Sequence, residues 1–223
     1  MTLDSIDRAD MTRLRITEIF YSLQGESLSV GRPTVFVRLT GCPLRCTYCD
    51  TAYAFSGGEW HGIDSILEKV ASFAAEHVCV TGGEPLAQRG VGELLNRLCD
   101  TGYKVSLETS GALDISGVDP RVSRVMDIKT PASGESDRNL IANFEQLESR
   151  DQIKFVIGDE DDYQWCRSML ETYQLHHSCE VLFSPVHGSM DAGRLADWVL
   201  RDRLPVRFQL QLHKLLWGET PGR

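Results

Sequence analysis

The sequence predicts an α/β fold built on a mostly parallel sheet that closes only part of the way into a (β/α) barrel. Strand and helix patterns alternate along the whole chain, which is typical of β-α units whose strands run parallel. Right-handed crossovers between such units leave either an open doubly wound sheet or a barrel-like sheet. At 223 residues the chain is short for a complete eightfold barrel of about 250 residues. We therefore expect one domain over residues 1–223, a partial, splayed barrel.

Strands are expected where β-branched and aromatic residues cluster in short runs, and helices where apolar residues recur every three or four positions. The expected strands are Arg15–Ser22, Thr34–Leu39, His77–Thr81, Tyr103–Leu107, Val122–Ile128, Gln152–Ile157, Val181–Ser184 and Val206–Leu212. The expected helices are Ile63–Glu76, Gly90–Cys99, Asn139–Leu147, Asp161–Tyr173 and Asp191–Arg201. Two further segments, Ser133–Arg138 and Gly188–Gly193, are expected to be loops.

Composition and charge exclude several classes of protein. No apolar run approaches the ~18 residues that a membrane span needs. Residues 1–13 mix acidic and basic side chains and lack the apolar stretch of a signal peptide, so we expect a flexible extension on a cytoplasmic protein with no membrane contact. The net charge is −9 and no dense block of Lys and Arg occurs, which argues against direct binding of nucleic acid.

Polar residues gather where five of the expected strands end. They are Thr81 to Pro85, Glu108 to Gly111, Asp127 with Lys129, Ser184 with Pro185, and Gln211 with His213 and Lys214. Ligands bind at the carboxyl ends of parallel strands. Loops are polar in any protein, so one such end means little. Five ends, two of them with glycine for close backbone approach, favour a ligand site.

Three of the seven cysteines form the pattern C-x3-C-x2-C directly after the second expected strand: Cys42, Cys46 and Cys49. Clustered cysteines do not fit a secreted disulfide framework and favour metal or redox chemistry in a reducing compartment. Thiolates at this spacing can wrap one side of a 4Fe-4S cluster, which normally takes four of them. One iron would then be left open for another ligand, as in reactive metal centres.

The residues alone leave three alternatives for this cysteine loop. It could hold a structural zinc with His61, twelve residues beyond Cys49, as a further ligand. Cys46 and Cys49 also form a C-x-x-C pair of the thioredoxin type, or all three thiols could be inert. The other four cysteines lie in or near apolar patterns and are interpreted as core or incidental thiols: Cys79, Cys99, Cys166 and Cys179.

The spacing of the three cysteines resembles the hallmark of the radical S-adenosylmethionine (SAM) superfamily. Tyr48 precedes the last cysteine, where that superfamily usually has an aromatic residue, and Thr81 to Pro85 resembles its glycine-rich contact to SAM. The resemblance implies a barrel of the radical SAM type and a 4Fe-4S cluster whose open iron chelates SAM. It assigns SAM to Tyr48, Cys49, Asp50, Gly83, Asp127, Ile128 and Lys129.

Within the superfamily the chain resembles the 7-carboxy-7-deazaguanine synthases over residues 20–214. The matching segments are Phe20 to Glu26, Phe36 to Pro43, Cys49 to Thr51, Thr81 to Pro85, Glu108 to Gly111, and Gln211, His213 and Lys214. The resemblance implies a carbon–nitrogen lyase. A 5′-deoxyadenosyl radical takes a hydrogen from carbon 6 of 6-carboxy-5,6,7,8-tetrahydropterin, the ring contracts, and ammonia leaves. The product, 7-carboxy-7-deazaguanine, feeds queuosine or another 7-deazapurine.

The same resemblance assigns roles to individual residues. It implies that the substrate is bound by Leu23, Gln24, Gly25, Arg38 and Thr81, and that Thr51 is a ligand of an Mg²⁺ ion. A guanidinium suits a carboxylate, and Mg²⁺ takes oxygen ligands. It also implies a homodimer and a one-electron reductant such as flavodoxin. We add three candidates for acid or base catalysis: Glu26, Glu108 and His213.

Simpler interpretations stand beside these roles. Arg38 could be a solvated charge at a strand edge, Thr51 a loop cap, and His213 a histidine that only satisfies local hydrogen bonds. Glu84 could bind backbone donors at the glycine turn. For the whole chain, the alternatives are another radical SAM enzyme, such as a glycyl-radical activase, and a zinc-binding interaction module.

Overall fold

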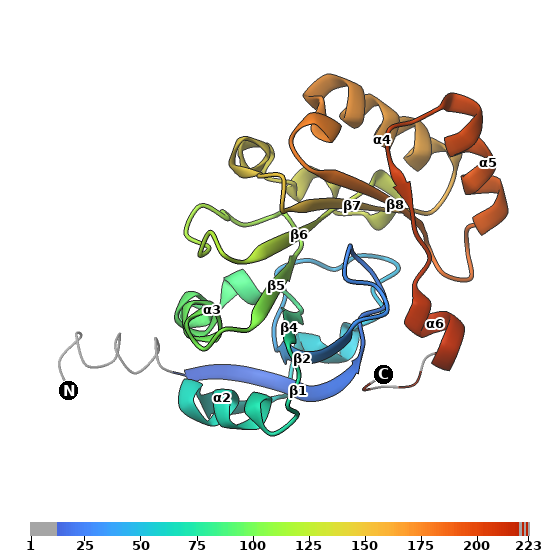
Figure 1. Ribbon diagram of the computed structural model, residues 1–223. Coiled ribbons are helices and arrows are strands. Elements are labelled where there is room, and N and C mark those ends of the chain that lie inside the picture. Colours follow the sequence, from blue (N-terminus) through green and yellow to red (C-terminus); the bar gives the residue numbers. More distant parts are fainter. Residues whose placement is uncertain (1–12, 219, 221, 223) are drawn as a thin grey trace.

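A computed structural model describes residues 13–218, 220 and 222, and within them the strands form one nine-stranded sheet (Figure 1). Its order is β3-β1-β2-β4-β5-β6-β7-β8-β9, with no pairing between the two edges. The strands are β1 (Arg13–Leu23), β2 (Pro33–Leu39), β3 (Glu59–Gly62), β4 (His77–Gly82), β5 (Lys104–Thr109), β6 (Ser123–Ile128), β7 (Gln152–Ile157), β8 (Glu180–Pro185) and β9 (Arg207–Phe208). The sheet is therefore open.

Strand direction confirms the predicted α/β class. The pairs from β2–β4 through β8–β9 are parallel, and only β1 runs antiparallel to its neighbours β2 and β3. From β4 to β9 the strands follow in chain order, so every crossover moves the same way around the sheet. Right-handed crossovers in one direction put their helices on one face. The result is the partial, splayed barrel that was expected rather than a doubly wound sheet.

Four helices cover the outer, convex face of this sheet: α2 (Ile63–Ala71), α3 (Val91–Asp100), α4 (Glu160–Tyr173) and α5 (Ala192–Asp202) (Figure 1). The short helix α6 (Leu212–Trp217) lies instead at the open side of the sheet, where His213 and Lys214 line the cavity. Short 3-10 turns are Ala52–Phe55, Pro85–Ala87, Pro131–Ser133, Ser136–Arg138, Ile141–Gln146 and Leu175–His177. Asp159 and Asp191 cap α4 and α5 by accepting hydrogen bonds from the backbone amides of Asp162 and Arg194. Apolar faces of α2 to α5 pack on the strands to form the core.

Several element predictions were wrong in their bounds. Helix α2 ends at Ala71 rather than Glu76, and Ala74 adopts a left-handed φ of 51° that turns the chain toward β4. The expected helix Asn139–Leu147 is a 3-10 turn over Ile141–Gln146. Strand β3 was missed, although it pairs with β1 along residues 13–16. Of the expected N-terminal extension, residues 1–12 lie outside the described part, and Arg13 already belongs to β1.

The largest difference lies at the C-terminal end of the chain. The expected strand Val206–Leu212 contains only the two-residue β9, and Leu212 begins helix α6. The side chain of Gln209 leaves the sheet edge, accepting from the amide of Ser27 at 2.7 Å and donating to its carbonyl at 2.9 Å. The amide of Leu212 then donates to the carbonyl of Gly25 at 2.9 Å. The segment after β9 is thus anchored to the turn after β1, on the opposite side of the barrel opening.

A buried ion pair joins β6 to the start of β7, at the amino ends of both strands. The carboxylate of Asp151 is fully buried and accepts from the backbone amide and the guanidinium of Arg124, and from the amide of Glu148. Arg124 also donates to the carbonyl of Gln146. Every charge in this cluster is compensated, which fixes two central strands relative to each other.

We predict that Asp151→Ala lowers the free energy of unfolding by about 3–5 kcal/mol, because it leaves a buried guanidinium without its counter-ion. Urea denaturation followed by circular dichroism measures this change. Asp100→Ala is the control, since it removes an exposed partner of Arg121 and is expected to change stability much less. Equal effects of the two substitutions would contradict the structural role of the buried pair.

Candidate active site

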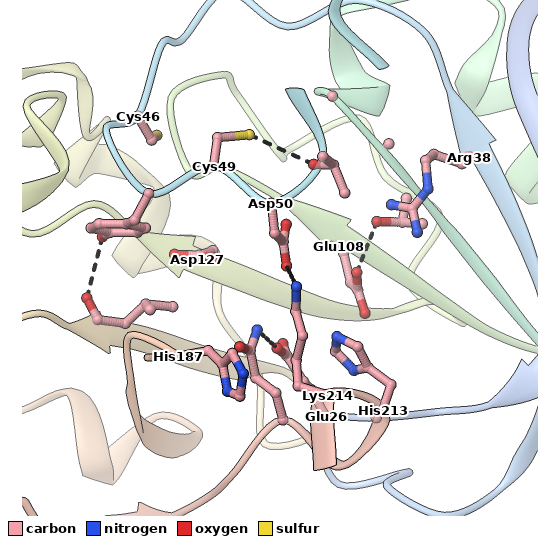
Figure 2. A pocket seen from close by; sticks show the side chains of 18 of the residues that line it. Glu26, Arg38, Cys46, Cys49, Asp50, Glu108, Asp127, His187, His213 and Lys214 are labelled. Atoms are coloured by element: carbon pink, nitrogen blue, oxygen red, sulfur yellow. Dashed lines mark hydrogen bonds and ion pairs between the residues drawn. The ribbon is translucent and has the colours of Figure 1, made fainter. Parts of the chain in front are cut away.

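The carboxyl ends of the strands surround a cavity of about 710 Å³, within the range of small-molecule sites. Figure 2 shows it from close by, with side chains from the β1 turn, the loop after β2, and the segment after β9 facing one another. All but one of the residues predicted to belong to the site line this cavity. The exception is Ile128, the last residue of β6, whose side chain is buried in the core.

The cysteine loop opens into the cavity. Cys42, Cys46 and Cys49 are partly exposed free thiols that line it together. Burial raises the pKa of the Cys42 and Cys46 thiols, and the positive charge of Lys129 acts against this rise at both. The backbone amide of Leu44 donates to the sulfur of Cys42 at 3.4 Å. Hydrogen bonds of this kind to a sulfur tune the potential of iron–sulfur centres.

The three thiols fit a cluster better than a single metal ion. Ligands that share one zinc lie about 2.3 Å from it, so any two of them are less than about 4.6 Å apart. Among the described residues, no three His, Cys, Asp or Glu side chains are grouped in a way that holds one ion. His61, the further ligand that zinc would need, lies in β3 and does not line the cavity. In a 4Fe-4S cluster each thiolate binds a different iron, so three thiols that do not converge on one ion can still hold a cluster.

The loop that carries the cysteines is held on both sides. On one side Thr47 donates to the carbonyls of Ser133 and Ala132, at 3.0 and 2.7 Å, and the Tyr48 hydroxyl donates to the carbonyl of Val156 at 3.2 Å. On the other side the amide of Glu84 donates to the carbonyl of Gly41 at 2.8 Å. These contacts fix the loop without using its sulfur atoms.

Two glycines at the end of β4, Gly82 and Gly83, allow the backbone to come this close to the loop. Gly82 has a φ of 149°, and a Cβ on it would lie 2.3 Å from the carbonyl oxygen of Leu39. A Cβ on Gly83 would lie 2.2 Å from the carbonyl oxygen of Gly41 and 2.9 Å from Cβ of Cys42. The fully buried carboxylate of Glu84 supports this turn by accepting from Thr109, Ser110 and Leu86. Glu84 therefore has the structural role considered from the sequence.

The residues assigned to the substrate form a connected polar group. Gln24 and Thr81 donate to the two carboxylate oxygens of Glu108, at 3.2 and 2.8 Å. Arg38 donates from Nε to Glu18 at 2.7 Å, and its side chain is only 14% exposed. Burial acts to lower the pKa of Arg38, but Tyr53 and Glu18 outweigh it and raise the pKa. The interpretation of Arg38 as a solvated edge charge is therefore wrong.

Thr51 stands at the end of the cysteine loop, where its hydroxyl lies 3.7 Å from the sulfur of Cys49. It occupies the N-cap position of the turn Ala52–Phe55 but makes no side-chain capping hydrogen bond, so the simpler interpretation as a cap has no support. Beside it, Lys214 reaches from α6 to Asp50 with a separation of 3.7 Å. The last helix therefore approaches the cysteine loop across the cavity.

His213 packs directly on the turn after β1. A Cβ on Gly25 would lie 2.0 Å from Nδ1 of His213, so this position requires glycine. Burial lowers the pKa of His213, while the carboxylates of Glu26 and Asp50 act in the opposite direction without reversing it. The imidazole is therefore neutral at pH 7.

Sequence reasoning missed Lys154, a buried lysine in the middle of β7. Its ammonium lies 2.6 Å from Glu26 and 3.2 Å from Asp127. The signal was present, because Lys154 is the only charge in the otherwise largely apolar strand Gln152–Ile157, and the strands of parallel sheets are mostly buried. A lone lysine in such a strand needs a carboxylate partner.

Comparison with known proteins agrees with this geometry. Residues 36–126 match the Radical SAM superfamily. The 7-carboxy-7-deazaguanine synthase of Chlorobaculum tepidum is 48% identical over 92% of this chain and 94% of its own, and that of Koribacter versatilis is 43% identical over 94% and 100%. The crystal structure of QueE from Escherichia coli superposes with a TM-score of 0.75 at 24% identity, covering 95% of this chain and 99% of that one.

The cysteine loop, the superfamily match and the curated relatives together define a radical SAM enzyme. More narrowly, the chain belongs to the 7-carboxy-7-deazaguanine synthase family, because curated relatives cover nearly its whole length at high identity. The resemblance seen in the sequence is thereby confirmed. The alternatives of a glycyl-radical activase and of a zinc-binding interaction module are wrong.

We predict that Gly83→Ala lowers the iron content after anaerobic reconstitution, because its new methyl group overlaps the backbone of the cysteine loop. Overpacking of this kind also reduces stability by about 1–3 kcal/mol. Iron analysis and the absorption spectrum measure the first effect. Gly92→Ala in α3 is the matched control, since a Cβ there meets nothing within 4 Å. The same iron content in both variants would contradict the packing argument.

Proposed function

We propose that this protein converts 6-carboxy-5,6,7,8-tetrahydropterin into 7-carboxy-7-deazaguanine with loss of ammonia, in an Mg²⁺-dependent reaction. Membership of the 7-carboxy-7-deazaguanine synthase family supports the reaction. The observation that carries the proposal is the shared cavity. The cysteine loop follows β2 and the Leu23–Gly25 turn follows its antiparallel neighbour β1, yet both line the same space.

Cys42, Cys46 and Cys49 would hold the 4Fe-4S cluster, with Gly83, Asp127 and Lys129 beside SAM. Bound there, a reduced cluster and SAM supply the 5′-deoxyadenosyl radical that starts the reaction. The protein contributes position and shielding. Its loop is fixed by backbone contacts, and its glycine turn leaves room for a ligand against the main chain.

The pterin would lie between the β1 turn and the strand ends, within reach of Gln24, Arg38 and Thr81. Arg38 is a buried cation that uses Nε for Glu18, so its terminal nitrogens suit the substrate carboxylate. Glu108 accepts from both Gln24 and Thr81 and sets the direction in which their remaining polar atoms point.

Thr51 would contribute one oxygen ligand to Mg²⁺. This ion keeps several waters and takes few protein ligands, so a single hydroxyl together with substrate oxygens is sufficient. The absence of a capping bond leaves the Thr51 hydroxyl available for this role. Thr51 follows Cys49 by two residues and lines the same cavity, so its hydroxyl would face a cation held there.

Of the three acid–base candidates, the site favours His213. The carboxylate of Glu26 is bonded to Lys154 and Gln211, both at 2.6 Å. Burial raises the pKa of Glu26, but these partners outweigh it and the pKa lies below its ordinary value, which makes a weak base. His213 is neutral and lines the same cavity, so it can accept a proton at neutral pH.

The proposed compartment, reductant and oligomeric state are those that suit a reducible cluster enzyme. All seven cysteines are free, and no helix in the described part is long and apolar enough to cross a bilayer. A cytoplasmic enzyme with a flavodoxin-type reductant suits a cluster that must be reduced. A homodimer would give partners to Leu215 and Leu216, which are 62% and 51% exposed on α6. Direct contact with nucleic acid is not part of the proposal.

We predict that the anaerobically reconstituted enzyme forms 7-carboxy-7-deazaguanine from the carboxytetrahydropterin, SAM and Mg²⁺, with the SAM concentration unchanged at the end. Mass spectrometry measures the product. Cys46→Ala is the control and is expected to form none. Cleavage of SAM to 5′-deoxyadenosine without a deazaguanine product would overturn the proposed substrate while leaving the enzyme class intact.

We predict that Thr51→Ala raises the Mg²⁺ concentration needed for half-maximal turnover by about tenfold, the loss of one oxygen ligand being worth roughly 1.4 kcal/mol. Cluster content and SAM binding are expected to stay nearly the same. Titration of turnover against Mg²⁺ tests this, with Thr51→Ser as the variant that restores the hydroxyl. An unchanged magnesium response in the alanine variant would refute the assignment.

A further inference from the structure

Four charged side chains of alternating sign form a chain across the floor of the cavity. Glu26 Oε2 lies 2.6 Å from Lys154 Nζ, which lies 3.2 Å from Asp127 Oδ2, and Asp127 Oδ1 lies 3.1 Å from Lys129 Nζ. Their side chains are between 11% and 20% exposed. The four charges sum to zero, so the chain compensates itself.

The two carboxylates belong to different halves of the site. Glu26 directly follows the Leu23–Gly25 turn on the substrate side, whereas Asp127 is in β6 on the side assigned to SAM (Figure 2). Lys154 is in β7, and the parallel register pairs it with Asp127. Its backbone is therefore fixed beside one carboxylate while its long side chain extends to the other.

Both contacts of Lys154 act between ions that are largely removed from water, where Coulomb interactions are strong. Burial acts to lower the pKa of Lys154, but Glu26 and Asp127 outweigh it and raise the pKa well above its ordinary value. Burial likewise acts to raise the pKa of Asp127, and Lys129 and Lys154 hold it below its ordinary value. The pKa of Glu26 is likewise held below its ordinary value by Lys154. Lys154, Asp127 and Glu26 are therefore all charged at neutral pH, and a change of charge at Glu26 alters the electrostatic field at Asp127.

We propose that Lys154 is a positioning residue that holds Glu26 on the substrate side and Asp127 on the SAM side with a single ammonium group. The inference rests on the proposed division of the cavity between pterin and SAM. It has a specific consequence. Neutralising Glu26 frees Lys154 to pair more closely with Asp127. Asp127 then contributes less to the binding of SAM. If the ion pair had only a structural role, a change at Glu26 would lower stability but would not alter SAM binding through Lys154.

The test is a double-mutant cycle in reconstituted enzyme, with Glu26→Gln and Lys154→Met made separately and together. Equilibrium dialysis under anaerobic conditions gives the Kd of SAM for each protein. We expect Glu26→Gln to weaken SAM binding at least about threefold when Lys154 is present, and by less than about twofold in the Lys154→Met background. Lys154→Arg should keep the coupling, because it preserves the charge. Lys104→Met removes an exposed lysine paired with Glu76 and should leave the Kd of SAM unchanged.

An equal effect of Glu26→Gln on the Kd of SAM in both backgrounds, or no effect in either, would overturn the proposal. Lys154→Gln, which removes the charge but keeps an N–H donor for Glu26, gives the same comparison if the methionine variant does not fold. Turnover of the pterin is measured on the same wild-type sample. Coupling without turnover would reject the proposed substrate alone, and turnover without coupling would reject the role of Lys154 alone.

Discussion

The close approach between the ends of β2 and β4 is the constraint on which the site depends. Their parallel register sets Arg38 beside Thr81 and Leu39 beside Gly82. Two backbone bonds continue this pairing beyond the sheet, from Gly83 to the carbonyl of Leu39 at 3.1 Å and from Glu84 to that of Gly41 at 2.8 Å. The cysteine loop begins at that point. A single pair of strands thus fixes the position of a proposed substrate contact, the glycine turn and the first thiol, and side chains larger than hydrogen at residues 82 and 83 would separate them.

The open sheet explains how residues far apart in sequence reach this point. Winding in one direction leaves the carboxyl ends of β2 and β4 to β9 facing the same space, but the gap between β9 and the β1 side is not closed by strand pairing. The segment after β9 crosses that gap. Gln209 binds the backbone of Ser27, Leu212 binds that of Gly25, and Lys214 approaches Asp50. A longer β9 would have continued the sheet and kept His213 out of the cavity, so its early end is part of how the site is built.

Much of this could be predicted from the sequence, because local patterns and spacing carry it. The alternation of strands and helices indicated the parallel sheet, and polar residues at strand ends indicated its ligand-binding edge. The early end of β9 could not be predicted, because the alternating pattern of Val206–Leu212 suits a strand, whereas the tertiary bonds of Gln209 to Ser27 and of Leu212 to Gly25 accompany its end. Lys154 was missed for a related reason. Its role depends on Glu26, 128 residues away, and no local pattern connects them.

The balance of charge in the cavity gives a physical reason for a divalent cation. Arg38, Lys129, Lys154 and Lys214 line it, and each is already ion-paired, with Glu18, Asp127, Glu26 and Asp50 in that order. A substrate carboxylate would therefore enter a site whose positive charges are largely neutralised, and it would have to compete with an internal carboxylate for any one of them. The proposed Mg²⁺ ion would bring two positive charges that no protein carboxylate needs to neutralise if the hydroxyl of Thr51 is its ligand. The buried ion pairs would then keep the two halves of the cavity in place, while the added cation would attract the anionic substrate.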